Sequence, residues 1–188
     1  MRIISGLFKG KKLIEPQDLK TRPLKDLTKE SIFNIIHHSN KFKIFLNKAN
    51  ILDIFSGVGS FGIECLSRGA KKVIFIENYK DVLSILKTNL ENLKTINNYG
   101  IIEKNAYEIS TFKIINEKFD IIFLDPPYKD KNIDSLLNNI LNENSLNSHG
   151  IIILHRHKDA KDNIPLNFKI IEKKQYGISK IIFITHSN

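Results

Sequence analysis

I-L-D-I-F-S-G-V-G-S-F-G-I-E, residues 51–64, is the stretch that decides how this chain folds. An apolar, strand-like run leads into Gly57, Gly59 and Gly62, and a helix-like stretch follows them. Glycines spaced G-x-G-x-x-G let a backbone approach a ligand closely, and Glu77 ends the next apolar run, 20 residues past Gly57. The pattern is typical of a nucleotide-binding turn at the start of an alternating α/β sheet.

Short apolar runs alternate with helix-length amphipathic stretches on the C-terminal side of the glycine turn. Such alternation, with strands that are apolar throughout, predicts a parallel sheet covered by helices on both faces. One expected helix carries Val82, Leu86, Leu90 and Leu93 on one face, and another contains the apolar residues of 136–141. The expected strands are residues 50–55, 72–77, 100–103, 119–125 and 150–155.

The end of the chain has a different rhythm. F-K-I-I-E-K-K and S-K-I-I-F-I-T flank Q-Y-G-I, so two strands meet at a tight turn. We expect this antiparallel hairpin to close one edge of the sheet. The fold class is therefore α/β: a Rossmann-like, mostly parallel sheet with a C-terminal antiparallel hairpin and a small N-terminal arm.

The N-terminal arm is predicted to be folded. R-I-I-S and K-K-L-I-E, within residues 2–15, predict two short strands, and a polar connector with Pro16 and Pro23 follows. T-K-E-S-I-F-N-I-I-H-H then predicts a helix with Thr28 or Asp26 as its N-cap. We expect residues 1–48 to pack as an arm on a catalytic domain of residues 49–188.

Positive charge is concentrated in this arm. Residues 1–50 hold 11 Lys/Arg and four Asp/Glu, whereas the other 138 residues hold 18 and 16 of a chain with net charge +9. A basic segment on a nearly neutral body favours binding to nucleic-acid phosphates, although a solubilising, lysine-rich surface would look similar. The expected phosphate contacts, which are RNA contacts if the partner is RNA, are Arg2, Lys9, Lys11, Lys12, Arg22 and Lys25.

The composition excludes several protein classes. Cys65 is the single cysteine, which excludes an internal disulfide and a multi-cysteine metal cluster and predicts core packing for that side chain. No apolar run is long enough to span a bilayer, and the start does not read as a secretory signal. We expect a cytoplasmic monomer without a metal or a membrane partner, and a surface position for His155-Arg156-His157.

Asp53 distinguishes between two kinds of nucleotide cofactor. A carboxylate just before the glycine turn would repel a pyrophosphate and attract an ammonium group. S-adenosylmethionine carries an ammonium, a sulfonium and a ribose, so we expect Asp53 at its amino-acid end, Glu77 at its ribose and Asn105 at its adenine. The alternatives are a capping or salt-bridging carboxylate for Asp53 and a turn or cap residue for Asn105. The predicted cofactor residues are Asp53, Phe55, Ser56, Gly57, Gly59, Glu77, Asn78, Asn105 and Ala106.

D-P-P-Y, residues 125–128, ends the fourth expected strand. Two prolines remove backbone donors, so carbonyl oxygens beside the Asp125 carboxylate form a cluster of acceptors. Asp125 and the Pro126 carbonyl would hold the amino group of a nucleobase with its lone pair aimed at a methyl donor. Tyr128 would stack on the unstacked base. A rigid proline turn is the structural alternative.

These motifs, in this order, resemble those of the adenosylmethionine-dependent amino-methyltransferases. R-I-I-S-G-L-F-K-G-K-K-L, T-R-P-L-K-D-L-T-K-E-S-I-F-N-I, L-S-R-G-A and Y-G-I-S-K-I-I-F resemble, more narrowly, the bacterial small-subunit (16S) ribosomal RNA guanine-N2 methyltransferases. The resemblance implies a seven-stranded methyltransferase sheet and methylation of one guanine amino group in assembling small subunits. Asn78 departs from the family, where an acid is common, and lysines replace many of its arginines.

Two other functions remain open at this point. A DNA adenine or cytosine amino-methyltransferase could use the same D-P-P-Y, although it would normally need a separate target-recognition domain. A nicotinamide-binding Rossmann protein would use the glycine turn, but it would leave D-P-P-Y without a task.

Overall fold

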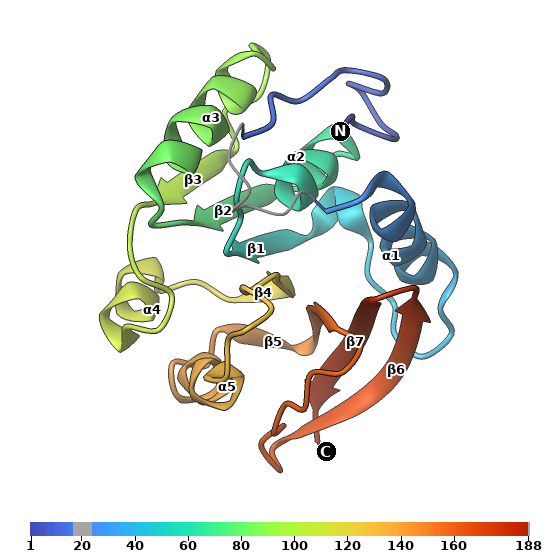
Figure 1. Ribbon diagram of the computed structural model, residues 1–188, viewed down its shortest axis with the longest axis vertical. Coiled ribbons are helices and arrows are strands. Elements are labelled where there is room, and N and C mark those ends of the chain that lie inside the picture. The colour runs from blue at the N-terminus through green and yellow to red at the C-terminus, as the bar shows by residue number, and fades with distance from the viewer. Residues whose placement is uncertain (17–23, 188) are drawn as a thin grey trace.

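The protein is built on one sheet of seven strands. The computed structural model describes residues 1–16 and 24–187 (Figure 1). The strands are β1 Asn50–Ile54, β2 Lys72–Ile76, β3 Tyr99–Ile102, β4 Phe119–Leu124, β5 Leu146–His157, β6 Phe168–Tyr176 and β7 Ser179–His186. The helices are α1 Asp26–His38, α2 Ser60–Ser67, α3 Lys80–Glu91, α4 Ile109–Ile115 and α5 Ile133–Asn142, with a 3₁₀ turn, η1, at Leu46–Lys48.

The strand order is β3-β2-β1-β4-β5-β7-β6. Strands β1 to β5 pair in parallel, and β7 pairs antiparallel with both β5 and β6. The expected fold class is therefore confirmed, including the closing hairpin. The order reverses between β1 and β4, and in open α/β sheets ligands bind at such a switch point, beyond the carboxyl ends of the strands.

Two hydrophobic clusters cover the two faces of the sheet. Successive residues of a strand point to opposite faces, so Ile51 and Phe123 join one cluster while Leu52 and Ile122 join the other. Side chains of α1, α2 and α3 complete the first cluster, and those of α4 and α5 complete the second. Figure 1 shows these two groups of helices on opposite sides of the sheet.

Strand β5 is longer than the sequence predicted. It begins at Leu146, which pairs with Phe119 of β4, and it runs through His157, which pairs with Ser179 of β7. The expected surface position of His155-Arg156-His157 is therefore wrong for its first two residues: His155 is 6% exposed and Arg156 only 2%. Cys65 is fully buried in α2, as expected.

In the described residues of the N-terminal arm, one β-bridge, Arg2↔Lys12, stands in place of the two predicted strands. The reason is that the backbone N–H groups of Ile4 and Ser5 donate to the buried Glu64 carboxylate of α2, at 2.7 and 2.9 Å, rather than to a facing strand. Ile3 and Leu13 enter the same cluster as α2. That residues 1–48 and 49–188 behave as arm and domain stays a prediction.

Helix α1 also begins differently from the expected capping. Asp26 is its first residue, Lys25 takes the N-cap position, and no side chain there makes a capping hydrogen bond. The predicted Thr28 or Asp26 cap is therefore wrong: Thr28 is buried inside the first turn, where its side chain lies beside the cavity described below. Within the described ranges, no helix is both long and apolar enough to cross a membrane.

Candidate active site

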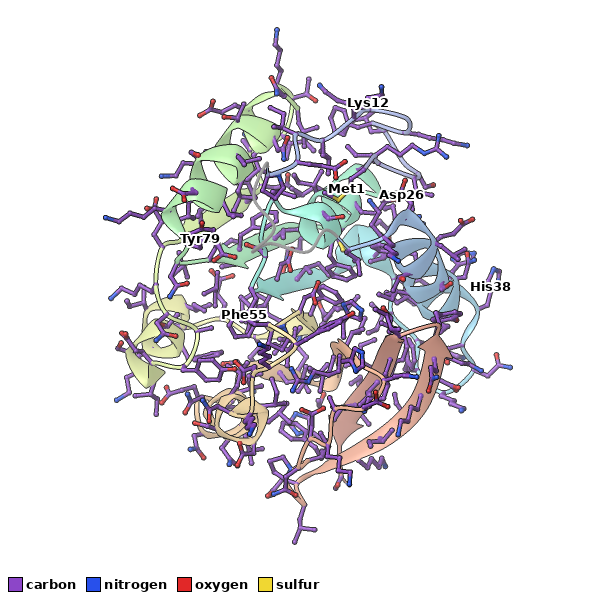
Figure 2. The ribbon with its side chains drawn as sticks, viewed as in Figure 1. Met1, Lys12, Asp26, His38, Phe55 and Tyr79 are labelled. Carbon is purple, nitrogen blue, oxygen red and sulfur yellow. The ribbon has the colours of Figure 1, made fainter. Side chains whose placement is uncertain are left out.

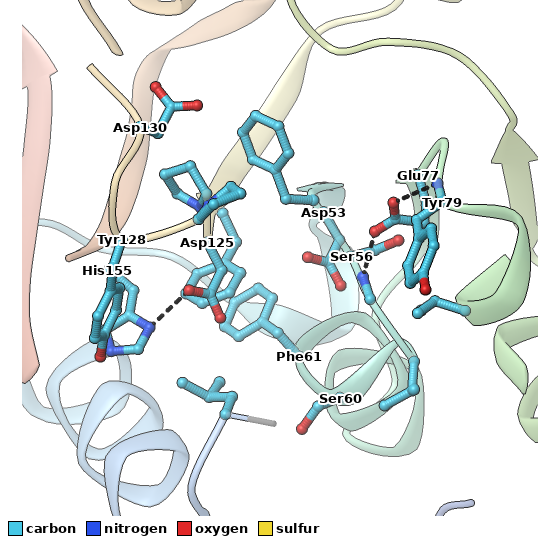
Figure 3. A pocket seen from close by; sticks show the side chains of 18 of the residues that line it. Asp53, Ser56, Ser60, Phe61, Glu77, Tyr79, Asp125, Tyr128, Asp130 and His155 are labelled. Carbon is cyan, nitrogen blue, oxygen red and sulfur yellow. Dashed lines mark hydrogen bonds and ion pairs between the residues drawn. The ribbon is translucent and has the colours of Figure 1, made fainter. Parts of the chain in front are cut away.

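A cavity of about 860 Å³ opens beyond the carboxyl ends of β1, β2, β4 and β5. Its lining includes Asp53, Glu77, Asp125, Tyr128 and His155, from four different strands or the turns that follow them (Figure 3). The parallel register brings the strand ends together at one edge, so residues far apart in the sequence meet there.

Some residues of the glycine turn line the cavity, and others allow close packing of neighbouring elements. Phe55 and Gly57 have positive φ angles of 59° and 55°, and both line the cavity. Positive φ in a residue other than glycine, such as Phe55, is a strained conformation that clusters at functional sites. Gly59 and Gly62 allow close packing around α2 instead: a Cβ on Gly59 would lie 2.5 Å from Leu86 of α3, and one on Gly62 would lie 2.3 Å from Phe75 of β2.

Asp53 is fully enclosed at the end of β1. Its side chain belongs to a residue only 1% exposed, and its Oδ2 accepts the N–H of Gly62 at 2.9 Å. Burial raises the pKa of Asp53 well above its usual range, against the lowering effect of the Gly62 hydrogen bond, and Asp125 and Glu77 raise it further. A cationic ligand beside Asp53 would offset this excess of negative charge.

Glu77 is held rigidly at the end of β2. Its Oε2 accepts the N–H of Gly57, and its Oε1 accepts the N–H groups of Asn78 and Tyr79, each at 2.9 Å (Figure 3). A carboxylate has about four lone-pair positions, so hydroxyl donors of a ligand can still bind to it. Ser56 and Asn78 line the cavity beside it.

Of the two predicted cofactor residues after β3, one lines the cavity and the other does not. Asn105 lines the cavity, and its Oδ1 also accepts the N–H of Tyr107 at 3.0 Å, the turn role named as its alternative. Ala106 is 3% exposed and belongs to the hydrophobic cluster, outside the lining. Gly59 also lies outside the lining.

Tyr79 and Tyr107 also line the cavity, and neither was among the residues predicted from the sequence. The ring centroid of Tyr107 lies 5.6 Å from that of Phe55. The Tyr107 hydroxyl donates to Asp130 at 2.5 Å, and burial together with this bond raises its pKa. An aromatic residue soon after a strand end was the available signal for both tyrosines.

D-P-P-Y follows β4 as expected. Asp125 Oδ1 lies 2.8 Å from His155 Nδ1 (Figure 3). Pro126 is buried, and Tyr128 presents its ring edge-on to His155 and His157, with centroids 6.0 and 5.3 Å away. The Tyr128 hydroxyl lies 3.4 Å from Ser179 Oγ.

Arg156 holds the backbone of the D-P-P-Y loop in place. Its Nη1 and Nη2 donate to the carbonyl oxygens of Pro127 and Asp130, at 3.2 and 2.6 Å. Its Nε donates to Asp162 at 2.9 Å, which balances the buried charge. The sequence could not reveal this role, because the partners come from two separate segments, the D-P-P-Y loop and the loop that holds Asp162.

The predicted RNA-binding residues do not gather at the cavity. Lys25 lines the cavity. The segment that carries Lys9, Lys11 and Lys12 lies elsewhere, because the Leu7 N–H donates to the Ser67 carbonyl at the C-terminal end of α2 and the Lys11 ammonium donates to the Asn92 carbonyl just past α3. Lys12 accordingly lies apart from Phe55 and Tyr79 (Figure 2). Arg2 faces Asp26 at 3.7 Å, Lys9 is exposed, and Arg22 lies outside the described residues.

No group of three or more His, Cys, Asp or Glu side chains in the described part of the chain is arranged to hold a metal ion. The cavity is lined by carboxylates, amide and hydroxyl groups and aromatic rings, together with Lys25, Lys129 and His155. Such a set can bind a cation, a ribose and a base that donates hydrogen bonds.

Comparisons with known proteins give consistent matches over the whole chain. The family model described as conserved hypothetical protein 95 matches residues 1–185. Ribosomal RNA small subunit methyltransferase D of Haemophilus influenzae is 32% identical over 95% of this chain and 90% of its own. The structure of yhhF from Escherichia coli superposes with a TM-score of 0.83 at 27% identity, covering 100% of this chain and 98% of that one.

A more distant structure shares the fold alone. SMU.776, solved in complex with SAH, has a TM-score of 0.64 at 15% identity, and covers 85% of this chain and 50% of that one.

Proposed function

The chain belongs to the family of ribosomal RNA small subunit methyltransferase D, and on this premise we propose that it transfers a methyl group from S-adenosylmethionine to the N2 amino group of a guanine in small-subunit ribosomal RNA. One observation carries the proposal: a single cavity joins the carboxylates at the ends of β1 and β2 to the D-P-P-Y acceptors after β4. A donor and a base bound at these two places would meet inside it.

The described residues fit S-adenosylmethionine. Asp53 is a buried carboxylate that accepts the uncharged N–H of Gly62 and lies within the influence of two further carboxylates, Asp125 and Glu77, which suits the ammonium group of an amino acid. Glu77 is fixed by three backbone N–H groups with lone pairs left for ribose hydroxyls. Phe55, Asn78, Asn105 and Tyr107 form the remaining wall, where an adenine would lie.

The state of the glycine turn argues against a dinucleotide. The N–H of Gly57 donates to Glu77, that of Gly59 to the Ser56 carbonyl and that of Gly62 to Asp53. A pyrophosphate site needs such N–H groups to point at the phosphates. These donors are engaged inside the protein, and carboxylates accept two of the three.

The chain's own residues would prepare the base for attack. S-adenosylmethionine supplies a methyl group on a positively charged sulfur. Asp125 and the Pro126 carbonyl would accept hydrogen bonds from the amino group, so its lone pair is held toward that methyl. The N–C bond forms as the C–S bond breaks, and one amino proton leaves. Asp125 stabilises the positive charge on nitrogen before that proton departs to solvent.

Methyl transfer from tritiated S-adenosylmethionine tests the proposal. The substrates are naked 16S ribosomal RNA, small subunits lacking the modification, and duplex DNA, and each product is digested to nucleosides. We expect label in N2-methylguanosine from one of the two RNA substrates. Label in the adenine or cytosine of DNA, or no label with binding of a nicotinamide cofactor instead, would overturn the proposed function.

A further inference from the structure

His155 occupies an unusual position at the end of β5. Its side chain is 8% exposed, and its Nδ1 lies 2.8 Å from Asp125 Oδ1. Its other nitrogen, Nε2, is buried and has no hydrogen-bond partner among the described residues. The ring of Tyr128 lies edge-on beside it, at 6.0 Å between centroids.

The hydrogen bond to Asp125 assigns a proton to Nδ1. A carboxylate oxygen accepts, so the Nδ1–H of His155 donates to Asp125 Oδ1. Nε2 makes no hydrogen bond to the described residues, so the bond to Asp125 is the one that orients the ring. His155 is therefore a donor that fixes one oxygen of a carboxylate.

The next residue immobilises the loop that carries this carboxylate. Arg156, 2% exposed, donates to the carbonyl oxygens of Pro127 and Asp130. Neighbouring residues on a strand point to opposite faces. His155 therefore holds the side chain of Asp125, and Arg156 holds the backbone of the D-P-P-Y loop, from the two sides of one strand.

We propose that His155 is a positioning residue for methyl transfer, acting through Asp125; this inference rests on the proposed function. By engaging Oδ1, it leaves Oδ2 as the oxygen of Asp125 that receives the amino group of the base. It also prevents the carboxylate from rotating away from the line of attack. A displacement of about 1 Å in such a group can cost about a hundred-fold in rate.

Three substitutions separate positioning from packing. His155→Leu removes the donor and keeps the apolar bulk. His155→Asn places an amide N–H near the position of Nδ1, whereas His155→Gln places it near Nε2. His149→Leu, at an exposed position of the same strand, is the matched control. For each variant we would measure kcat and KM on ribosomal RNA, the dissociation constant of S-adenosylmethionine and the melting temperature.

We expect His155→Leu to lower kcat by about 10- to 100-fold while the affinity for S-adenosylmethionine stays within about three-fold. His155→Asn should recover most of the loss, His155→Gln should recover less, and His149→Leu should match the wild type. If His155→Leu does not fold, a higher kcat for Asn than for Gln supports the proposal.

Two results would overturn the proposal: a folded His155→Leu variant with the wild-type kcat, or equal losses in the Asn and Gln variants. A wild-type protein that does not methylate ribosomal RNA would refute the proposed function, and this role would fall with it. The two failures are distinguishable, because the first requires an active wild type.

Discussion

Lys29 Nζ lies 3.3 Å from Oε2 of Glu64, and both side chains are fully buried. Burial lowers the pKa of Lys29, and the charge of Glu64 opposes that shift. Lys29 also donates to the Arg2 carbonyl, while Glu64 accepts from Ile4 and Ser5. The pair therefore fastens the N-terminal arm and α1 to the helix that follows the glycine turn.

Removing half of this pair should destabilise the protein strongly. Glu64→Gln leaves the buried ammonium of Lys29 without its carboxylate, which costs about 3–5 kcal/mol, and the melting temperature should fall by about 10 °C. Glu117→Gln is the control, because its ion pair with Lys72 is partly exposed and contributes about 1 kcal/mol or less. Equal melting temperatures for the two variants would contradict the role given to Glu64.

Asp53→Asn should raise the stability of the ligand-free protein at neutral pH. A raised pKa in the folded state means that Asp53 stabilises the fold when protonated, and that this contribution is lost as the pH rises through the folded-state pKa. The variant should therefore melt above the wild type at about pH 7.5, and the difference should shrink toward about pH 4. Thermal melts across this range would measure it.

The same variant should bind S-adenosylmethionine more weakly, because the charge that attracts its ammonium is gone. We expect a loss of about ten-fold or more in affinity by calorimetry. Wild-type affinity in Asp53→Asn would remove Asp53 from the cofactor site.

Glu77→Ala should also weaken S-adenosylmethionine binding. A charge-assisted hydrogen bond contributes about 1.5–3 kcal/mol, so we expect about ten-fold or more in the dissociation constant. The Gly57 N–H loses its acceptor as well, and the glycine turn should loosen. Calorimetric titration checks the affinity, with Glu103→Ala, a partly exposed ion-pair residue, as control. Unchanged affinity would refute the ribose assignment.

Tyr128 should act through its ring rather than its hydroxyl. Stacking on a base needs the ring rather than the hydroxyl, which lies 3.4 Å from Ser179 Oγ, so Tyr128→Phe should change methyl transfer little. Tyr128→Ala should cost about 1–3 kcal/mol in engagement of the base, visible in KM for RNA with unchanged S-adenosylmethionine affinity. If the Phe and Ala variants were equally impaired, stacking would be the wrong explanation.

The arm lysines should contribute to RNA affinity at a distance from the cavity. Alanine at Lys9, Lys11 and Lys12 should weaken RNA binding and flatten its log–log salt dependence by about 0.7 per lost phosphate contact on single strands. A Lys113/Lys118/Lys169→Ala variant removes the same charge from exposed positions elsewhere. The docking role fails if both variants bind RNA equally well with parallel salt dependences.

The sequence alone determined the sheet and one half of the site. Apolar runs, helical periodicity and the glycine turn are local signals, so the first four expected parallel strands appear within two residues of their predicted bounds. Asp53 lies near the end of β1, while Glu77, Asp125 and Tyr128 follow strand ends, and parallel strands bring their carboxyl ends to one edge. Their meeting in one cavity could therefore be predicted without coordinates.

Only the tertiary structure decided the contacts that cross between segments. The predicted arm strands are replaced by one bridge, because Glu64 of α2 takes the N–H groups of Ile4 and Ser5. β4 and β5 pair as Leu124↔Leu154, so the next residues along, Asp125 and His155, lie side by side. No local pattern encodes a strand neighbour or its register. The neighbours and the register follow from how the whole sheet buries its two apolar faces, and they place His155 beside the D-P-P-Y carboxylate.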